Sequence, residues 1–246
     1  MAPDDQQICA TIAGMARLLG IILAFICLAG TARAGDELAS AGTFSYLLTT
    51  GGGPPAYAVI LMPGGRGILE PRLDNNGRIA FRMGGNFLIR SRALFATGPF
   101  VAASTDATTT PERILAIAGD LQRRYGAALK LYVVGTSRST ESTMALAAPL
   151  DGKVAGFVHS SSMNAIASFD TRRFKSRHLI VLHKRDVCRV TQPAAGEVSH
   201  KTFGTELIEM DGGKSTGDDC EAFAYHGYNG IERDTVDRIK AWIAAK

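Results

Sequence analysis

The sequence predicts an α/β fold built on a mostly parallel, doubly wound sheet with helices on both faces. Short β-branched or apolar runs alternate with helical patterns along residues 35–246, the order expected when crossover helices connect parallel strands. Two of these runs, AYAVILM at 56–62 and LYVVG at 131–135, are apolar throughout. Strands that are buried on both faces have this composition. No repeat or long linker divides residues 35–246, so we expect a single domain.

The first elements follow from local composition. Residues 43–49 (TFSYLLT) predict a strand that ends in the Gly/Pro turn at 51–55, and 56–62 predict the first buried strand. Residues 74–77 end in Asn-Gly, which predicts a hairpin turn. Residues 86–95 have a helical pattern.

The second half repeats the alternation of strand and helix. Strands are predicted at 100–103, 130–134, 154–159, 178–183 and 206–210. Helices are predicted at 111–125, where Pro111 suits a first helical turn, at 140–148, and at 231–245, where apolar residues recur at helical spacing.

Residues 1–34 have the order of a signal peptide. Arg17 precedes the apolar run 18–30, and small residues then lead to a cleavage site after Ala34. A membrane anchor is the alternative, but the run is shorter than the ~20 apolar residues that a spanning helix needs. The sequence therefore predicts a periplasmic or secreted protein, residues 35–246, with no stable membrane anchor after cleavage.

The charge balance gives little indication of a macromolecular partner. The net charge of the chain is +4, and the charges within residues 1–34 cancel. This is too mild to indicate nucleic-acid binding, and the densest basic stretch, 172–177, is typical of a solvated connection. We expect a small-molecule or extended ester substrate and no nucleic acid; nothing in the sequence indicates an oligomeric state.

Four cysteines are present, and Cys9 and Cys27 lie in the predicted signal peptide. Cys188 and Cys220 remain as an even pair in an oxidising compartment, which favours a disulfide over two unrelated buried thiols.

Residues 131–139 (LYVVGTSRS) predict a nucleophilic serine, Ser137, at a sharp strand-to-helix turn. Such a turn exposes the serine Oγ and needs small residues two positions before and after it. Gly135 meets this requirement, and Ser139 stands where glycine is usual. The alternative is an ordinary strand-turn-helix unit with a capping serine.

A glycine-rich loop, PGGRG at 63–67, follows the buried strand 56–62. Acyl transfer needs backbone N–H donors directed at the developing oxyanion. We assign this role to the N–H groups of Gly65 and Arg138, the residue after the nucleophile. The alternative is a turn that only reverses the chain.

The acid and the base should follow the serine in the order Ser, Asp, His. Asp186 comes directly after the strand 178–183, where sites of α/β sheets gather. His226 lies in a loop before the last helix. We expect His226 to take the proton of Ser137 and Asp186 to orient the imidazole.

Other histidines and acids of the chain are rivals for these two roles. His159 and His183 end strands and could line the site, whereas His178 and His200 are expected to be structural or exposed. The rival acids lie too near His226 along the chain for the usual placement at a strand end: Asp211, Asp218 and Asp219.

The segments GGRG, NFLIRSRALFA, VVGTSRS, HKRDVC and DDCEAFAYHGYNGIE together resemble a group of small exported bacterial α/β hydrolases. The resemblance covers nearly all of residues 35–246. It implies the α/β-hydrolase fold, a triad of Ser137, Asp186 and His226, and a disulfide between Cys188 and Cys220. Similar members often read Gly-Thr-Ser-Arg-Gly, so Ser139 is the departure, and it raises the question of turn strain and activity.

The strand 154–159 follows the turn at Ser137 (the nucleophile elbow), and the strand 178–183 precedes Asp186. Only residues 164–177 separate these two strands, and this connection is too short for a large cap domain. We therefore expect an open site, walled by the hairpin at 75–76 and by residues 185–201. No metal-ligand spacing, Walker loop or dinucleotide fingerprint occurs, so no metal and no cofactor is expected.

The predicted function is hydrolysis of carboxylic esters through an acyl-enzyme on Ser137. The alternatives are a serine peptidase or amidase with the same triad, and a catalytically silent periplasmic binding protein of the same fold, which Ser139 would favour.

Overall fold

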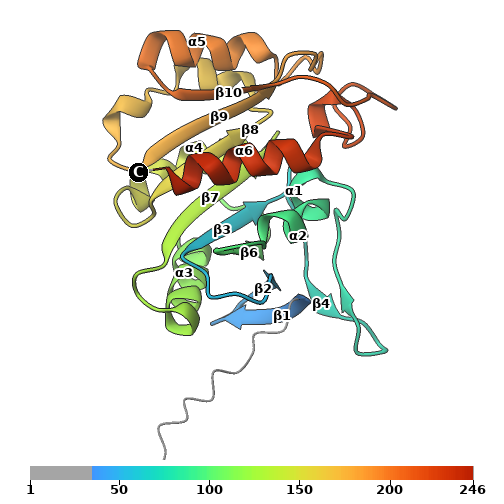
Figure 1. Cartoon of the computed structure of the whole chain (residues 1–246), viewed down its shortest axis with the longest axis vertical. Coiled ribbons are helices and arrows are strands. Elements are labelled where there is room, and N and C mark those ends of the chain that lie inside the picture. The colour runs from blue at the N-terminus through green and yellow to red at the C-terminus, as the bar shows by residue number, and fades with distance from the viewer. Residues whose placement is uncertain (1–34, 246) are drawn as a thin grey trace, which may run out of the picture. The chain divides into compact units, whose positions relative to one another are not determined.

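The computed structural model describes residues 35–245, which contain an eight-stranded sheet in the order β1-β2-β6-β3-β7-β8-β9-β10 (Figure 1). The first two pairings are antiparallel and the others are parallel. The strands are β1 Gly35–Ala41, β2 Phe44–Thr50, β3 Tyr57–Met62, β6 Phe100–Ser104, β7 Lys130–Thr136, β8 Gly156–Ser160, β9 Arg177–His183 and β10 Glu206–Met210. The predicted α/β fold with a mostly parallel sheet is confirmed. The predicted signal peptide lies outside the described residues.

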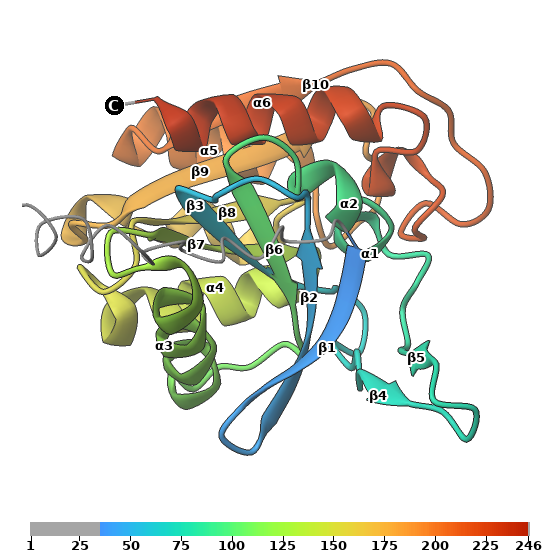
Figure 2. The same cartoon turned by 60° about the horizontal axis from the view of Figure 1, so that its bottom comes forward.

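Helices cover both faces of the sheet (Figures 1 and 2). One face packs against α3 Glu112–Tyr125 and α4 Ser139–Leu150, and the other against α1 Phe87–Arg90, α2 Arg92–Phe95 and α6 Glu232–Ala244. Successive side chains of β3 enter opposite cores: Ile60 joins the first, and Val59 and Leu61 join the second. This alternation explains why the strand is apolar at every position.

The predicted strands and helices agree with the structure to within a few residues, with two omissions. The strand β1 is a polar edge strand (GDELASA) whose residues have low strand propensity. The helix α5, Pro193–Phe203, packs Gly196 against β9. In addition, the predicted helix at 86–95 is interrupted at Ser91, which separates α1 from α2.

No cap domain covers the carboxyl ends of the strands within residues 35–245, as expected. Only two short 3-10 turns, η1 Asn164–Ser168 and η2 Thr171–Arg173, lie between β8 and β9. The predicted hairpin is present as β4 Arg72–Leu73 and β5 Ile79–Ala80, with Gly77 in the left-handed region at φ 72°. Figure 2 shows it projecting away from the sheet.

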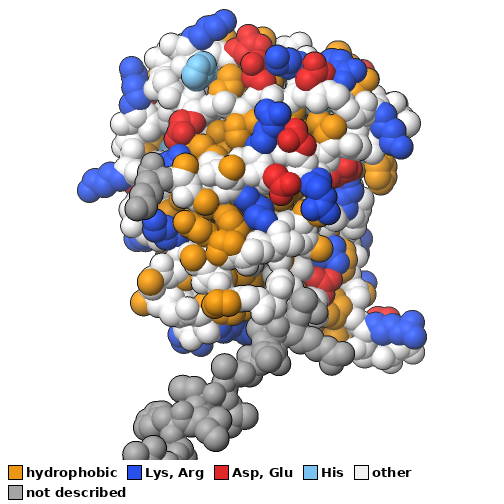
Figure 3. Space-filling view, viewed as in Figure 1, with side chains coloured by type: hydrophobic (Ala, Val, Ile, Leu, Met, Phe, Trp, Pro, Cys, Tyr) orange, Lys and Arg blue, Asp and Glu red, His pale blue; other side chains and the backbone are white. Residues whose placement is uncertain are grey.

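The surface is mixed in character. Figure 3 shows basic, acidic and hydrophobic side chains interspersed over the face on which α6 lies. Among residues 35–245, no helix is long and apolar enough to cross a membrane.

Candidate active site

Ser137 lies at a strained turn between β7 and α4. Its φ is +54°, in the left-handed region that non-glycine residues rarely adopt. The turn leaves no room for a side chain two residues before the serine, because a Cβ on Gly135 would lie 2.5 Å from the carbonyl oxygen of Ser139. Gly64 is equally confined, since its Cβ would lie 2.8 Å from the carbonyl oxygen of Thr136. The predicted elbow and the predicted oxyanion loop are thus packed directly against each other.

Ser139 adds hydrogen bonds that glycine could not make. Its Oγ lies 2.7 Å from the carbonyl oxygen of Met62 and 2.9 Å from that of Thr136. It also accepts the N–H of Thr136 at 2.8 Å. The side chain is 2% exposed. The hydroxyl therefore joins the elbow to the end of β3, and the residue that departs from the usual pattern is accommodated.

We predict that Ser139→Ala lowers the free energy of unfolding by about 1–3 kcal/mol, because it leaves a buried backbone donor unpaired. Urea denaturation would measure the change. Ser168→Ala is the matched control: its hydroxyl makes one exposed hydrogen bond to a backbone carbonyl, so its effect should stay within about 0.5 kcal/mol. Equal effects of the two substitutions would contradict the bridging role of Ser139.

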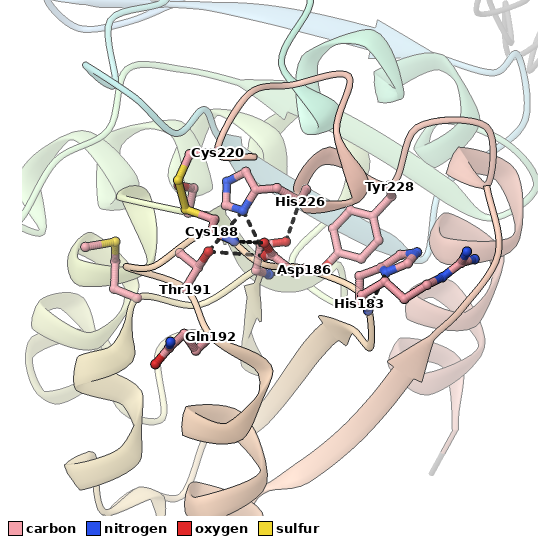
Figure 4. A network of polar contacts seen from close by, with 12 residues as sticks. His183, Asp186, Cys188, Thr191, Gln192, Cys220, His226 and Tyr228 are labelled. Atoms are coloured by element: carbon pink, nitrogen blue, oxygen red, sulfur yellow. Dashed lines mark hydrogen bonds and ion pairs between the residues drawn. A yellow bond between two sulfur atoms is a disulfide. The ribbon is translucent and has the colours of Figure 1, made fainter. Parts of the chain in front are cut away.

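Asp186 and His226 are brought together although they are far apart in the sequence (Figure 4). Nδ1 of His226 lies 2.9 Å from Oδ2 of Asp186, and both residues are buried. The other carboxylate oxygen, Oδ1, accepts the N–H of Cys188 at 2.9 Å. A carboxylate accepting from Nδ1–H leaves Nε2 of the imidazole unprotonated, the form that a general base requires.

Thr191 is a further member of this network that sequence reasoning missed. Its Oγ1 donates to Oδ2 of Asp186 at 3.2 Å and lies 3.0 Å from Nδ1 of His226. Because the hydroxyl proton is directed at Asp186, the oxygen accepts from the ring N–H, which supports the same tautomer. Thr191 lies two residues before the missed helix α5, and no motif in the sequence around it signals its role.

The loop that carries His226 is held by Ser161, which follows β8 directly, and by the backbone of β9. Oγ of Ser161 donates to the carbonyl oxygen of His226 at 2.7 Å. The hydroxyl of Tyr228 donates to Val181 at 2.8 Å and accepts the N–H of Ser161 at 2.9 Å. Ser161 and Tyr228 both have positive φ, 41° and 57°. Strained residues therefore gather around the candidate site, as is typical of functional sites.

The predicted disulfide is present between Cys188 and Cys220. It joins the loop after Asp186 to the loop before His226, as Figure 4 shows. Asp186, Cys188 and His226 lie close enough to suggest a metal-ligand group. The disulfide bond, however, leaves Cys188 without the thiolate that a metal would bind.

The rival histidines lie elsewhere. His159 and His178 are buried and stacked on each other, and Nε2 of His159 lies 3.1 Å from Nδ1 of His178. Burial lowers the pKa of both, that of His178 to about 4. Nε2 of His183 lies 3.0 Å from the carbonyl oxygen of Gly212. The interpretation that His159 and His183 could line the site is wrong, because neither borders the cavity that contains Ser137. His178 is structural, as expected.

Among residues 35–245, none of the rival acids forms a hydrogen bond or ion pair with the imidazole of His226. Asp211 is exposed and pairs with Arg185 at 2.9 Å. Asp218 and Asp219 are exposed in the loop before Cys220.

Ser137 and His226 border one cavity of about 490 Å³. Gly64 and Gly65 also line this cavity, and Gly65 has φ +60°. Arg138 precedes the first turn of α4, where a backbone N–H has no acceptor within the helix. Both predicted oxyanion donors thus lie beside the predicted nucleophile.

The walls of this cavity differ from those expected. They are formed by two segments, 83–87 and 220–223, and not by the hairpin at 75–76 or by residues 185–201. Phe223 is half exposed, and its ring lies 3.6 Å from the position that a Cβ on Gly85 would take. The β4–β5 hairpin extends away from the sheet instead of folding over it.

No protein-family model and no curated protein matches this sequence. Solved structures do match. Est1E from Butyrivibrio proteoclasticus is 12% identical, with a TM-score of 0.57 over 85% of this chain and 98% of its own. An α/β serine hydrolase without a lid from Xanthomonas campestris is 10% identical, with a TM-score of 0.54 over 87% and 96%. A dienelactone hydrolase from Anabaena variabilis is 12% identical, with a TM-score of 0.57 over 85% and 96%.

These likenesses extend over nearly the full length of each known chain, and they agree with a mostly parallel sheet flanked by helices. Residues 35–245 have the α/β-hydrolase fold, as the resemblance of the motifs implied, and they contain no lid, as the short connection at 164–177 predicted.

Proposed function

We propose that this protein is a serine hydrolase that cleaves carboxylic esters through an acyl-enzyme on Ser137. The observation that carries the proposal is the cavity that Ser137 and His226 both line. Nδ1 of His226 is hydrogen-bonded to the buried carboxylate of Asp186. Structures of the same fold that are described as a serine hydrolase, a monoglyceride lipase and a dienelactone hydrolase support hydrolysis. Ester cleavage and the triad itself rest on the chemistry of the residues.

In the proposed mechanism, Nε2 of His226 removes the proton of Ser137 as Oγ attacks the ester carbonyl. Asp186 stabilises the imidazolium that forms. The N–H groups of Gly65 and Arg138 donate to the oxyanion. The imidazolium then protonates the leaving alcohol, and water attacks the acyl-enzyme with the same base. Every group in this proposed mechanism belongs to the chain or to water, and the absence of a cofactor stays a prediction from the sequence.

We propose further that the protein acts in the periplasm or outside the cell. The disulfide supports this location, because disulfides persist in oxidising compartments. The absence of a nucleic-acid partner and of a membrane anchor after signal cleavage stay predictions from the sequence.

A fluorophosphonate probe tests the proposed function. We expect it to label the wild-type protein at Ser137, with labelling abolished in Ser137→Ala and strongly reduced in His226→Ala. His200→Ala is the matched control, since His200 is exposed and lies outside the cavity. Mass spectrometry of the adduct and hydrolysis of short acyl esters would be measured.

A folded wild-type protein that neither labels nor hydrolyses esters would contradict the proposal and favour the silent binding protein. No observation in the structure favours that alternative, because Ser139, its main support, fits the elbow. Hydrolysis of anilides at a rate comparable to that of matched esters would instead indicate an amidase or peptidase.

A further inference from the structure

Resting on the proposed function, we infer that the preferred substrate is an ester that also carries an anionic group, such as a carboxylate. A second cavity, of about 390 Å³, adjoins the first. It is lined by Arg66 and Arg138, and it shares Gly65 and Arg66 with the cavity that contains Ser137. A substrate whose ester reaches Ser137 can therefore place another group between these two arginines.

The charges in this second cavity favour an anion. Neither Arg66 nor Arg138 forms an ion pair with another residue in the described part of the chain. Arginines nearby are engaged, since Arg82 pairs with Glu70 at 2.6 Å and Arg113 pairs with Asp106 at 3.3 Å. Guanidinium groups match the geometry of carboxylates and can bind them in a bidentate manner.

One acidic residue, Glu141, also lines the second cavity. Two guanidinium groups and one carboxylate leave a net positive charge there. Both arginines are exposed, so water screens the attraction and the gain for each pair is modest. The carboxylate of Glu141 repels an anion. Replacing it with a neutral side chain should therefore strengthen the preference for the anionic ester.

The first cavity takes the apolar remainder of the same substrate. Met83, Phe87 and Phe223 line it together with Ser137 and His226. The two cavities together therefore suit a small molecule with an apolar part, an ester and an anion. A long neutral acyl chain would leave the arginines unused.

The test compares matched pairs of esters. One pair is the 4-nitrophenyl half-ester of glutaric acid and 4-nitrophenyl pentanoate, with the carboxylate on the acyl part. The other is 4-acetoxybenzoate and 4-tolyl acetate, with the carboxylate on the alcohol part. The ratio of kcat/KM for the anionic ester to that for the neutral ester is measured for each variant, so that intrinsic reactivity cancels.

We expect the ratio of at least one pair to fall about tenfold when Arg66→Gln and Arg138→Gln are combined, the size expected from two exposed pairs. Glu141→Gln should raise it. The control Arg173→Gln, exposed and in η2 away from both cavities, should leave it unchanged. High salt should lower the wild-type ratio but not that of the double variant.

A second measurement separates this inference from the proposed function. Ser137→Ala retains the arginines, so calorimetry should detect tighter binding of the anionic ester than of the neutral one without turnover. Preferential binding with no hydrolysis by the wild type would overturn the esterase proposal and keep the anion site. Hydrolysis with ratios that the arginine substitutions do not change would overturn the anion site alone.

Discussion

Asp186→Asn should lower kcat for ester hydrolysis by about four orders of magnitude while the protein stays folded. The N–H of Cys188 requires an oxygen at the position of Oδ1, so the amide nitrogen of asparagine would face Nδ1 of His226. Nδ1 would then have to accept a hydrogen bond, which places the ring proton on Nε2. The imidazole could no longer take the proton of Ser137. Steady-state kinetics and circular dichroism would measure the loss and the integrity of the fold.

Asp211→Asn is the matched control for this substitution. Asp211 is exposed and pairs with Arg185 at the surface, so we expect kcat to change by no more than about twofold. Retention of more than a tenth of the wild-type kcat by a folded Asp186→Asn variant would show that another group orients His226.

The second large effect concerns the disulfide between Cys188 and Cys220. It closes a loop with a sequence separation of 32 residues, which corresponds to about 3–4 kcal/mol of stability in the chain-entropy model. We expect the double substitution Cys188→Ala and Cys220→Ala to lower the free energy of unfolding by this amount. Guanidinium denaturation of the two proteins would measure it.

Loss of the disulfide should also weaken catalysis before the sheet unfolds. Cys188 is held two residues from Asp186, and Cys220 borders the cavity with His226. Without the bond, the acid loop and the histidine loop are positioned independently, so kcat should fall while circular dichroism is unchanged. Dithiothreitol should reproduce the loss in the wild type and have no effect on the double variant. Full turnover by a folded protein with free Cys188 and Cys220 would contradict this role.

The local signals in the sequence were sufficient for the fold. Parallel strands that are buried on both faces are apolar almost throughout, and this composition predicted β3 and β7. The elbow was also visible, because a turn as sharp as that at Ser137 admits only small neighbours such as Gly135 and Ser139. The order Ser, Asp, His and the pair of cysteines then indicated which distant residues to expect together.

Other features carry no local signal. The edge strand β1 is polar and pairs only because β2 offers an open edge. Thr191 resembles any loop threonine until folding brings its hydroxyl to Asp186 and His226. The prediction of the cavity walls was wrong for the same reason. The direction in which the β4–β5 hairpin projects depends on contacts between segments and not on the sequence of its turn.

The sequence by itself determined the alternation of strands and helices, the place of the serine turn and the identity of the cysteine pair, because each depends on residues that are neighbours along the chain. Only the tertiary structure decided how Ser139 binds the end of β3 and which segments wall the cavity. It also brought Arg66 and Arg138 to one hollow beside Ser137. These features depend on distances between segments far apart in the chain, which are set when the helices pack on the two faces of the sheet.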